Sequence, residues 1–115
     1  MTTKGHRDLV VWQKGMDVVM ATYALTKLFP SDEKFGLISQ MRRASVSIPS
    51  NIAEGRKRGG EVEFKQFLRI AFGSTAELET QIEIAHRLHY VSLAQIQSLT
   101  NLLNEVMRML SKMTQ

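Results

Sequence analysis

The chain has 115 residues, which favours a single domain over residues 1–115, and we expect residues 1–7 to form a flexible N-terminus. Its 43% hydrophobic and 23% charged residues are near the globular averages and exclude a wholly disordered or fibrous chain. The absence of cysteine excludes disulfides, thiolate catalysis and sulfur-ligated zinc, and the net charge of +4 favours polyanionic partners.

The first helix is predicted for about residues 8–29. Asp8 is its expected N-cap, and Pro30 stops it because proline cannot continue a helix. Apolar residues that recur at helical spacing predict the buried face of this helix: Trp12, Met16, Val19, Met20 and Tyr23.

The second helix is predicted from about Phe35 to Glu54, with Gly55 ending it as a C′ glycine. Pro49 interrupts the pattern, since a proline inside a helix removes one amide donor and clashes with the preceding turn. We favour one continuous helix kinked near Pro49 over two short helices. The predicted buried face consists of Leu37, Met41, Ala44, Ile48 and Ile52.

The third helix is predicted from about Glu61 to Leu88, and the fourth from the N-cap Ser92 to about Met113. A wide apolar stripe predicts the buried face of the third helix: Phe64, Phe67, Leu68, Ala71, Thr75, Leu78, Ile82 and Ala85. The fourth helix carries a sharper seam with alternating steps of three and four residues: Ile96, Leu99, Leu103, Val106, Leu110 and Met113.

Short links between these helices force neighbouring helices to run antiparallel. The predicted fold is therefore all-α, an antiparallel up-down-up-down four-helix bundle. No stretch approaches the ~18 consecutive apolar residues of a membrane-spanning helix, and no segment has the pattern of a signal peptide. We expect a cytoplasmic protein that makes no membrane contact.

The segment Gly55–Gly60 is the expected link between the second and third helices, and it is rich in glycine and cations. The segment from Arg42 to Arg69 contains seven cationic and three carboxylate side chains. Its net charge of +4 equals the net charge of the whole chain. Cations, flexible amides and a nearby helix N-terminus suit phosphate, which predicts binding to RNA or DNA, against the alternative of a solubilising turn. No aromatic residue is interleaved with the cations of the loop, so we expect little base stacking. The candidate residues are Arg56, Lys57, Arg58, Lys65 and Arg69.

Polar residues border the predicted buried stripes of the second and third helices. Arg43 lies next to Ala44, and Glu77 lies next to Leu78. A buried charge needs a partner and hydrogen bonds, which predicts an Arg43–Glu77 pair across the two helices. We interpret the set as a structural network that fixes helix register rather than as an active site: Gln40, Arg43, Asn51, Glu54, Glu77 and Gln81.

No motif indicates catalysis, a cofactor or a metal, and we expect a non-enzymatic protein without a small-molecule substrate. Glu83 and His86 form one Glu-x-x-His motif, whereas a di-iron bundle uses two such motifs and further glutamates. We interpret this pair as surface polar residues. The serines of the central helices lack the strand-to-helix elbow and the histidine partner of an esterase nucleophile.

The predicted fourth helix is poor in charge, because only Glu105, Arg108 and Lys112 are charged between Ser92 and Met113. A helix with a solvated face normally carries more charge. Leu102 and Met109 form a second apolar stripe beside the seam. We interpret this stripe as an oligomer interface, and the alternative is a neutral exposed face of Ser, Thr, Asn and Gln.

The sequence also resembles a known family through motifs that appear in order over residues 8 to about 91. The most specific is the run from Ser47 to Gly55. The others are Asp8-Leu-Val-Val-Trp12-Gln13-Lys14, Phe29-Pro30, Phe35-Gly36-Leu37, Gln40-Met-Arg42-Arg43-Ala44 and Ala71-Phe-Gly73-Ser74-Thr-Ala-Glu77-Leu78-Glu79. These motifs resemble the bacterial four helix bundle protein family, which some bacteria encode within intervening sequences of large-subunit ribosomal RNA genes.

This family is similar to the accessory variability determinant proteins of diversity-generating retroelements. The resemblance implies a four-helix bundle that assembles as a homopentamer and has no known catalysis. For the retroelement branch it implies binding to a reverse transcriptase and RNA through basic surfaces. We therefore expect a non-enzymatic oligomer that binds nucleic acid or a nucleoprotein, and the alternative is a purely structural interaction protein.

Overall fold

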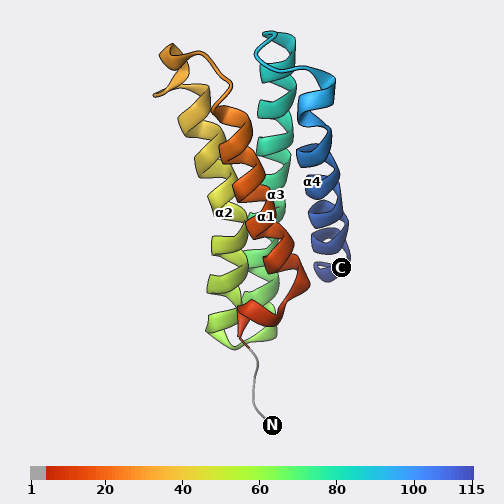
Figure 1. The fold of residues 1–115 in the computed structure, drawn as a ribbon. Coiled ribbons are helices and arrows are strands. Elements are labelled where there is room, and N and C mark those ends of the chain that lie inside the picture. Colours follow the sequence, from red (N-terminus) through yellow and green to blue (C-terminus); the bar gives the residue numbers. More distant parts are fainter. Residues whose placement is uncertain (1–4) are drawn as a thin grey trace.

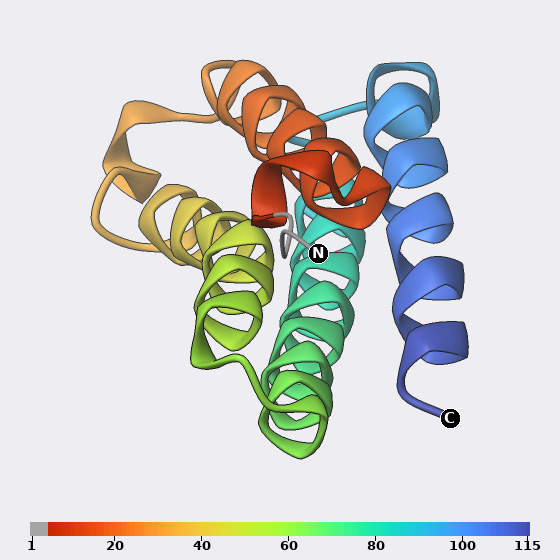
Figure 2. The ribbon, with the colours of Figure 1, turned by 90° about the horizontal axis from the view of Figure 1, so that it is seen from below.

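The computed structural model describes residues 5–115, and within this range four α-helices and two short 3-10 helices follow one another without a strand. The α-helices are α1 (Val10–Thr26), α2 (Leu37–Arg58), α3 (Glu61–Arg87) and α4 (Leu93–Met113), and the 3-10 helices are η1 (His6–Asp8) and η2 (Ser31–Glu33). Each α-helix packs against its neighbours in the sequence, and α4 also packs against α1 (Figure 1, Figure 2). This arrangement confirms the predicted antiparallel four-helix bundle.

The N-terminal end differs from the prediction. His6–Asp8 form η1, which contacts both α1 and α2, so residues 5–7 are not a free tail. The remainder of the expected flexible N-terminus, residues 1–4, lies outside the described residues. Asp8 belongs to η1, and the N-cap of α1 is Leu9 instead. The helix is also shorter than expected, because it ends at Thr26 rather than near Phe29.

α1 buries a different face from the one that its apolar pattern predicts. The buried residues lie mostly one position before the predicted stripe: Val11, Gly15, Val18, Thr22, Leu25 and Thr26. Thr22 and Thr26 tolerate burial because their hydroxyls donate to backbone carbonyls one turn earlier, at 2.7 and 2.9 Å. The predicted stripe borders α2 instead, and its Met16, Met20 and Tyr23 are exposed.

α2 runs without interruption through Pro49, which confirms the continuous helix, while a bend at Pro49 stays a prediction. Gly15 of α1 faces this segment. A Cβ atom on Gly15 would lie 3.5 Å from the Ile48 side chain and 3.6 Å from the Pro49 Cβ, which are ordinary van der Waals distances. α1 therefore packs directly against α2 at the proline.

The end of α2 corrects the prediction for the link to α3. Gly55 lies within the helix, which continues to Arg58 and ends at Gly59. Gly59 has a φ of 83°, a left-handed conformation that glycine adopts without strain. The expected loop from Gly55 to Gly60 therefore shrinks to its last two residues.

α3 and α4 follow the prediction within one residue at each end. Ser92 caps α4 through a capping box with Gln95, because its hydroxyl accepts from the Gln95 amide and the Gln95 side chain accepts from the Ser92 amide. The buried residues of α4 all belong to the predicted seam: Leu99, Leu103, Val106 and Leu110. Within residues 5–115, no helix is both long and apolar enough to cross a membrane.

Candidate nucleic-acid interface

The five cations predicted to contact phosphate lie at the end of the bundle where α2 meets α3. This set is referred to below as the basic end: Arg56, Lys57, Arg58, Lys65 and Arg69. Because α2 extends to Arg58, its three cations occupy the last helical turn rather than a loop. They are consequently held on a regular scaffold, at the helix terminus whose macrodipole favours positive charge.

The cations of α2 lie against aromatic rings of α3. The Arg56 guanidinium lies 5.7 Å from the centre of the Phe64 ring, and the Arg58 guanidinium lies 5.2 Å from that of Phe67. Arg58 also pairs with Glu54 one turn earlier, at 3.0 Å. These contacts orient two guanidinium groups at the end of the bundle while leaving the Lys57 and Arg58 side chains exposed.

Lys65 and Arg69 belong to the other flank of α3, next to the end of α4. Lys65 Nζ donates to the Gln115 carbonyl at 3.1 Å, and an Arg69 Nη donates to the Thr114 carbonyl at 3.4 Å. The basic end therefore has two flanks, one against α2 and one against α4. A polyanion that contacts all five cations has to pass around the N-terminus of α3.

A hollow of about 220 Å³ lies at that N-terminus, between the last turn of α2 and the first turn of α3. Its lining comprises Gly55, Arg56, Gly59, Gly60, Glu61 and Phe64. Gly60 is the N-cap of α3 and supplies no side-chain cap, so the first amides of the helix have no acceptor from their cap residue. Exposed Glu61 and Glu63 share this turn with the cations.

The buried Arg43–Glu77 pair is wrong. Both side chains are exposed, and no ion pair joins them in the described chain. They lie one position from Ala44 and Leu78, which do face the core, and that single step along each helix turns the charges outward. The prediction failed because an edge position of an amphipathic helix has no distinct sequence signal.

The seam between α2 and α3 is fixed by smaller polar groups. The hydroxyls of Ser47 and Ser74 bond each other at 2.8 Å across the two helices. The Asn51 amide donates to the Ser47 carbonyl and hydroxyl at 2.8 and 2.9 Å. Gln81 is buried, and its amide lies 3.5 Å from a Glu77 carboxylate oxygen. Of the predicted network, Asn51 thus lies in the seam and Gln81 is buried, whereas Gln40 is exposed and Glu54 pairs with Arg58.

The stripe of Leu102 and Met109 is partly buried and packs against the core of its own bundle. It is therefore not a free surface in the isolated chain. More exposed apolar side chains occur on other helices, where Met20 of α1 is 67% and Ile70 of α3 is 52% exposed. Met20 belongs to the apolar pattern that predicts a buried face of α1, and that part of the prediction is wrong.

The Glu-x-x-His motif lies at the surface, as predicted for a pair of polar residues. Glu83 is exposed and pairs with Arg87 at 2.8 Å, and the hydrogen bond from Arg87 lowers the pKa of Glu83. The serines of the central helices make structural contacts, since Ser45 donates to the Arg42 carbonyl at 2.8 Å. The basic end is therefore a better candidate for a ligand-binding site than the Glu-x-x-His motif or the serines.

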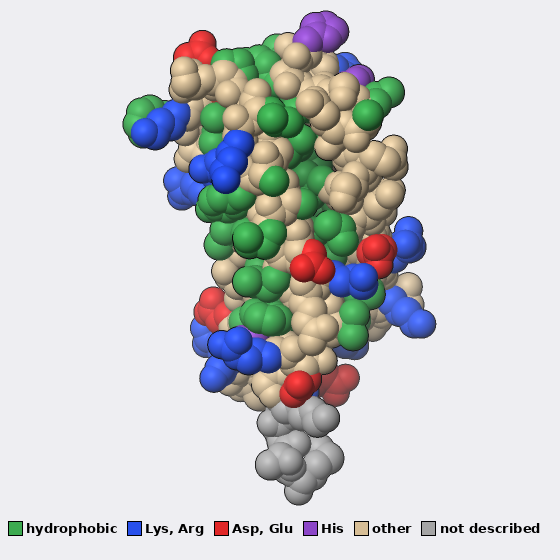
Figure 3. Space-filling view, viewed as in Figure 1, with side chains coloured by type: hydrophobic (Ala, Val, Ile, Leu, Met, Phe, Trp, Pro, Cys, Tyr) green, Lys and Arg blue, Asp and Glu red, His purple; other side chains and the backbone are tan. Residues whose placement is uncertain are grey.

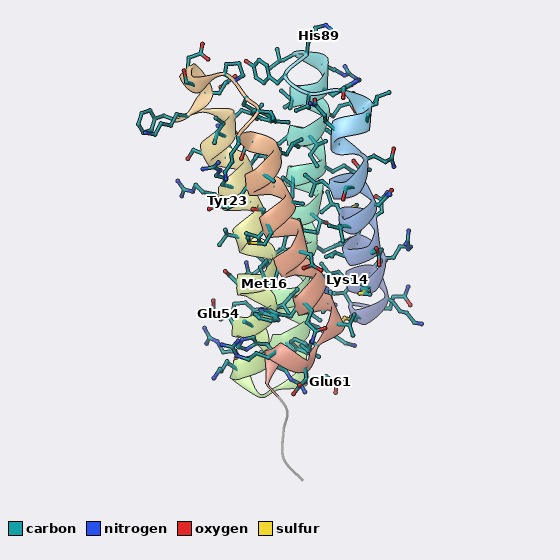
Figure 4. The ribbon with its side chains drawn as sticks, viewed as in Figure 1. Lys14, Met16, Tyr23, Glu54, Glu61 and His89 are labelled. Carbon is teal, nitrogen blue, oxygen red and sulfur yellow. The ribbon has the colours of Figure 1, made fainter. Side chains whose placement is uncertain are left out.

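The opposite end of the bundle is held by one hydrogen bond between two links. The Tyr90 hydroxyl donates to a Glu33 carboxylate oxygen at 2.7 Å, and the Leu37 amide donates to the other oxygen at 3.2 Å. The Tyr90 bond, followed by the Leu37 bond, lowers the pKa of Glu33, and the same carboxylate raises the pKa of Tyr90. His89, labelled in Figure 4, makes the adjacent turn with a φ of 63°.

Comparison with known proteins identifies a family and a solved structure that the chain resembles. Residues 7–112 match the family described as 23S rRNA-intervening sequence protein. A solved structure of a protein of unknown function from the S23 ribosomal protein family of Bacteroides thetaiotaomicron VPI-5482 is 26% identical to the chain. The match has a TM-score of 0.84 and covers 92% of this chain and 99% of that one. Among curated proteins, none matches.

Proposed function

The chain belongs to the family of 23S rRNA-intervening sequence proteins, and from this premise we propose that it is a non-enzymatic bundle that binds the phosphate backbone of RNA through the basic end. The observation that carries the proposal is the concentration of Arg56, Lys57 and Arg58 in one helical turn beside the N-terminus of α3. Backbone contacts of this kind read phosphate and not sequence. We also propose that the protein binds this RNA in the cytoplasm.

The geometry supports phosphate contacts in three ways. The cations of α2 stand on a helix and not on a loop, so little backbone entropy is lost when they bind. The α3 N-terminus adds positive potential and amide donors. A hollow of about 220 Å³ separates these groups and leaves room for a phosphate. The same surface would also fit a reverse transcriptase that carries RNA, the partner implied by the resemblance to accessory variability determinant proteins.

A triple substitution tests the proposal. Arg56→Gln, Lys57→Gln and Arg58→Gln together remove the charges and keep good helix formers in the last turn of α2. We expect this variant to lose most of its affinity for RNA at low salt, measured by fluorescence anisotropy. The matched control replaces Lys27, Lys34 and Arg87, which lie toward the opposite end, by glutamine. Equal affinities of the two variants would contradict the proposal.

A second proposal concerns self-association, and one observation favours it. The outer face of α3 exposes apolar side chains, with Val62, Ile70 and Ile84 at 73%, 52% and 42%. Beside it, the Gln81 Oε1 atom is buried without a hydrogen-bond partner in residues 5–115. A neighbouring copy would cover the apolar side chains. We propose that copies associate through this face, in the ring of five that the sequence resemblance implies.

A further inference from the structure

A groove between α1 and α2 opens beside the basic end. It holds about 330 Å³, roughly the volume of eleven liquid waters, and is referred to below as the α1–α2 groove. Figure 3 shows a band of hydrophobic side chains along α1 and α2, with a cluster of Lys and Arg side chains near its lower end. The groove is lined by His6, Trp12, Met16, Val19, Val46, Pro49, Ser50 and Ala53.

The apolar lining of the groove is open to solvent. Met16 is 38% and Val46 is 39% exposed, one from each wall. Figure 4 shows Met16 and Tyr23 on the face of α1 that borders α2. Small-molecule sites are typically concave and mostly apolar with a few polar groups, and the α1–α2 groove has such a lining.

Trp12 stands among nitrogen-bearing side chains. The His6 ring meets the Trp12 ring edge-on at a centroid distance of 5.0 Å, and the Arg7 guanidinium lies 5.9 Å from the Trp12 ring. His6 Nδ1 is buried and has no hydrogen-bond partner in the described chain. An indole, an imidazole and a guanidinium therefore meet at one place, where the Trp12 and His6 side chains line the groove.

Cations stand beyond both ends of the groove along α2. Arg42 lies one turn before Val46, while Arg56 and Lys57 lie one turn beyond Ala53, because residues three or four apart share a helix face. The distance along α2 from Arg42 to Arg56 is about 21 Å at a rise of ~1.5 Å per residue. No carboxylate is among the lining residues, and Glu54, next to Ala53, pairs with Arg58.

We propose that the α1–α2 groove takes an unpaired base of a single-stranded nucleic acid beside Trp12, while Arg56 and Lys57 contact the adjoining phosphates. This inference rests on the proposed function and specifies the ligand as a single strand with an unpaired base. A single strand can splay out a base to stack on an aromatic side chain, whereas a duplex keeps its bases paired and stacked. Charge complementarity favours this occupant over a second copy of the chain, since cations flank the apolar lining.

The expectation of little base stacking rests on the lack of an aromatic residue among the cations of the loop and on the assignment of Phe64 and Phe67 to the core. Trp12 lies more than forty positions earlier in the chain, and the contact of η1 and α1 with α2 brings it to the surface beside the basic end. Besides Phe64 and Phe67, which lie against Arg56 and Arg58, an aromatic ring from α1 therefore lies near the cations.

Trp12 supplies its own probe because it is the one tryptophan in the sequence. The emission of the unmutated protein is followed during titration with a single-stranded oligoribonucleotide, the matching duplex and heparin, a polyanion without bases. We expect the single strand to quench the emission. The duplex and heparin are expected to leave it nearly unchanged, although both bind the basic end.

Substitutions in the groove, with one matched control, separate the contribution of the groove to binding from that of the cations. Ala53→Leu fills the groove without changing the charge, and Ala76→Leu makes the same change on the exposed surface of α3. We expect Ala53→Leu to abolish the quenching and Ala76→Leu to preserve it. Trp12→Leu removes the stacking ring, and we expect it to weaken single-strand binding by roughly 5- to 150-fold, the range for base–aromatic stacking, with duplex binding unchanged.

Each alternative outcome is distinct. Single strand and duplex that bind equally, without quenching, would overturn the groove assignment and leave the proposed function intact. Failure of every polyanion to bind would overturn both proposals. Emission that changes with protein concentration, and not with RNA, would show that a second copy occupies the groove.

Discussion

Gly55 of α2 and Phe67 of α3 lie so close together that a Cβ atom on the glycine would stand 2.6 Å from the Phe67 Cβ. Both atoms are fixed to their helices, so no side-chain rotation relieves the contact. The glycine therefore sets the spacing of α2 and α3 directly above the basic end. It also explains why a glycine occurs inside the helix, where it would otherwise lower stability.

The first prediction follows from this contact. Gly55→Ala should lower the free energy of unfolding by up to about 2 kcal/mol, since overpacking costs roughly 1–3 kcal/mol and the gain in helix propensity offsets about 1 kcal/mol. Gly73→Ala is the matched control, because Gly73 lies within α3 and a Cβ there meets nothing within 4 Å. It should raise stability by about 0.5–1 kcal/mol. Urea denaturation measures both, and equal shifts would contradict the account.

The second prediction concerns Tyr90 and Glu33. Tyr90→Phe should destabilise the bundle, because it removes the hydroxyl that donates to Glu33. The pKa of Glu33 is lowered in the folded state, so its contribution is present above the ordinary pKa of the carboxyl and is lost as the pH falls through the lowered value. The stability difference between the two proteins should accordingly be full at neutral pH and shrink in acid.

The tyrosine gives the same test at high pH. Its folded pKa is raised, so its contribution is present below its ordinary pKa and is lost as the pH rises through the raised value. Tyr23→Phe serves as the control, since the Tyr23 hydroxyl makes no hydrogen bond within residues 5–115. A stability difference for Tyr90→Phe that stays constant from acid to alkaline pH would count against the bond.

The third prediction separates the exposed polar residues from those in the seam. Arg43→Ala should change the unfolding free energy by no more than about 0.5 kcal/mol, as expected for a surface position. Asn51→Ala removes two hydrogen bonds to Ser47 and should cost about 1 kcal/mol. Thermal denaturation of both variants checks the ranking. A larger loss of stability for Arg43→Ala than for Asn51→Ala would contradict the surface role of Arg43.

The sequence predicted the buried face of α4 but not that of α1, and the reason lies in their composition. In α4, leucine and valine mark the seam and polar residues mark most of the other positions. In α1, the predicted stripe is the more apolar of two adjacent stripes, and the one that faces the core contains Gly15, Thr22 and Thr26. The two threonines tolerate burial because their hydroxyls bond backbone carbonyls, which hydropathy does not register.

The residues of the candidate site were predicted from composition, and the structure corrects the position of the helix end that carries them. The positions of the cations follow from the sequence, but Gly55 and Gly59 are both plausible helix ends. In the structure the helix passes the first glycine, which packs against Phe67, and ends at the second, which has the left-handed conformation. The candidate residues predicted from the sequence do not include Trp12, because its place beside the basic end depends on the contacts of η1 and α1 with α2.

The fourth prediction tests the proposed assembly. Ile84→Glu places a charge on the exposed outer face of α3, and it should dissociate the oligomer without unfolding the bundle. Leu102→Glu should instead destabilise the fold, because Leu102 packs against the core of its own chain. Light scattering reports the mass, and circular dichroism reports the fold. A monomeric unmutated protein at micromolar concentration would refute the assembly.

The salt dependence of RNA binding tests the central proposal most directly. For a single strand, the logarithm of the association constant should fall linearly with the logarithm of the salt concentration, by about 0.7 per phosphate contact. Replacing Arg56, Lys57 and Arg58 by glutamine should reduce the magnitude of this slope by up to about 2. An unchanged slope in the variant, or no RNA binding by the unmutated protein at low salt, would contradict the assignment of the basic end.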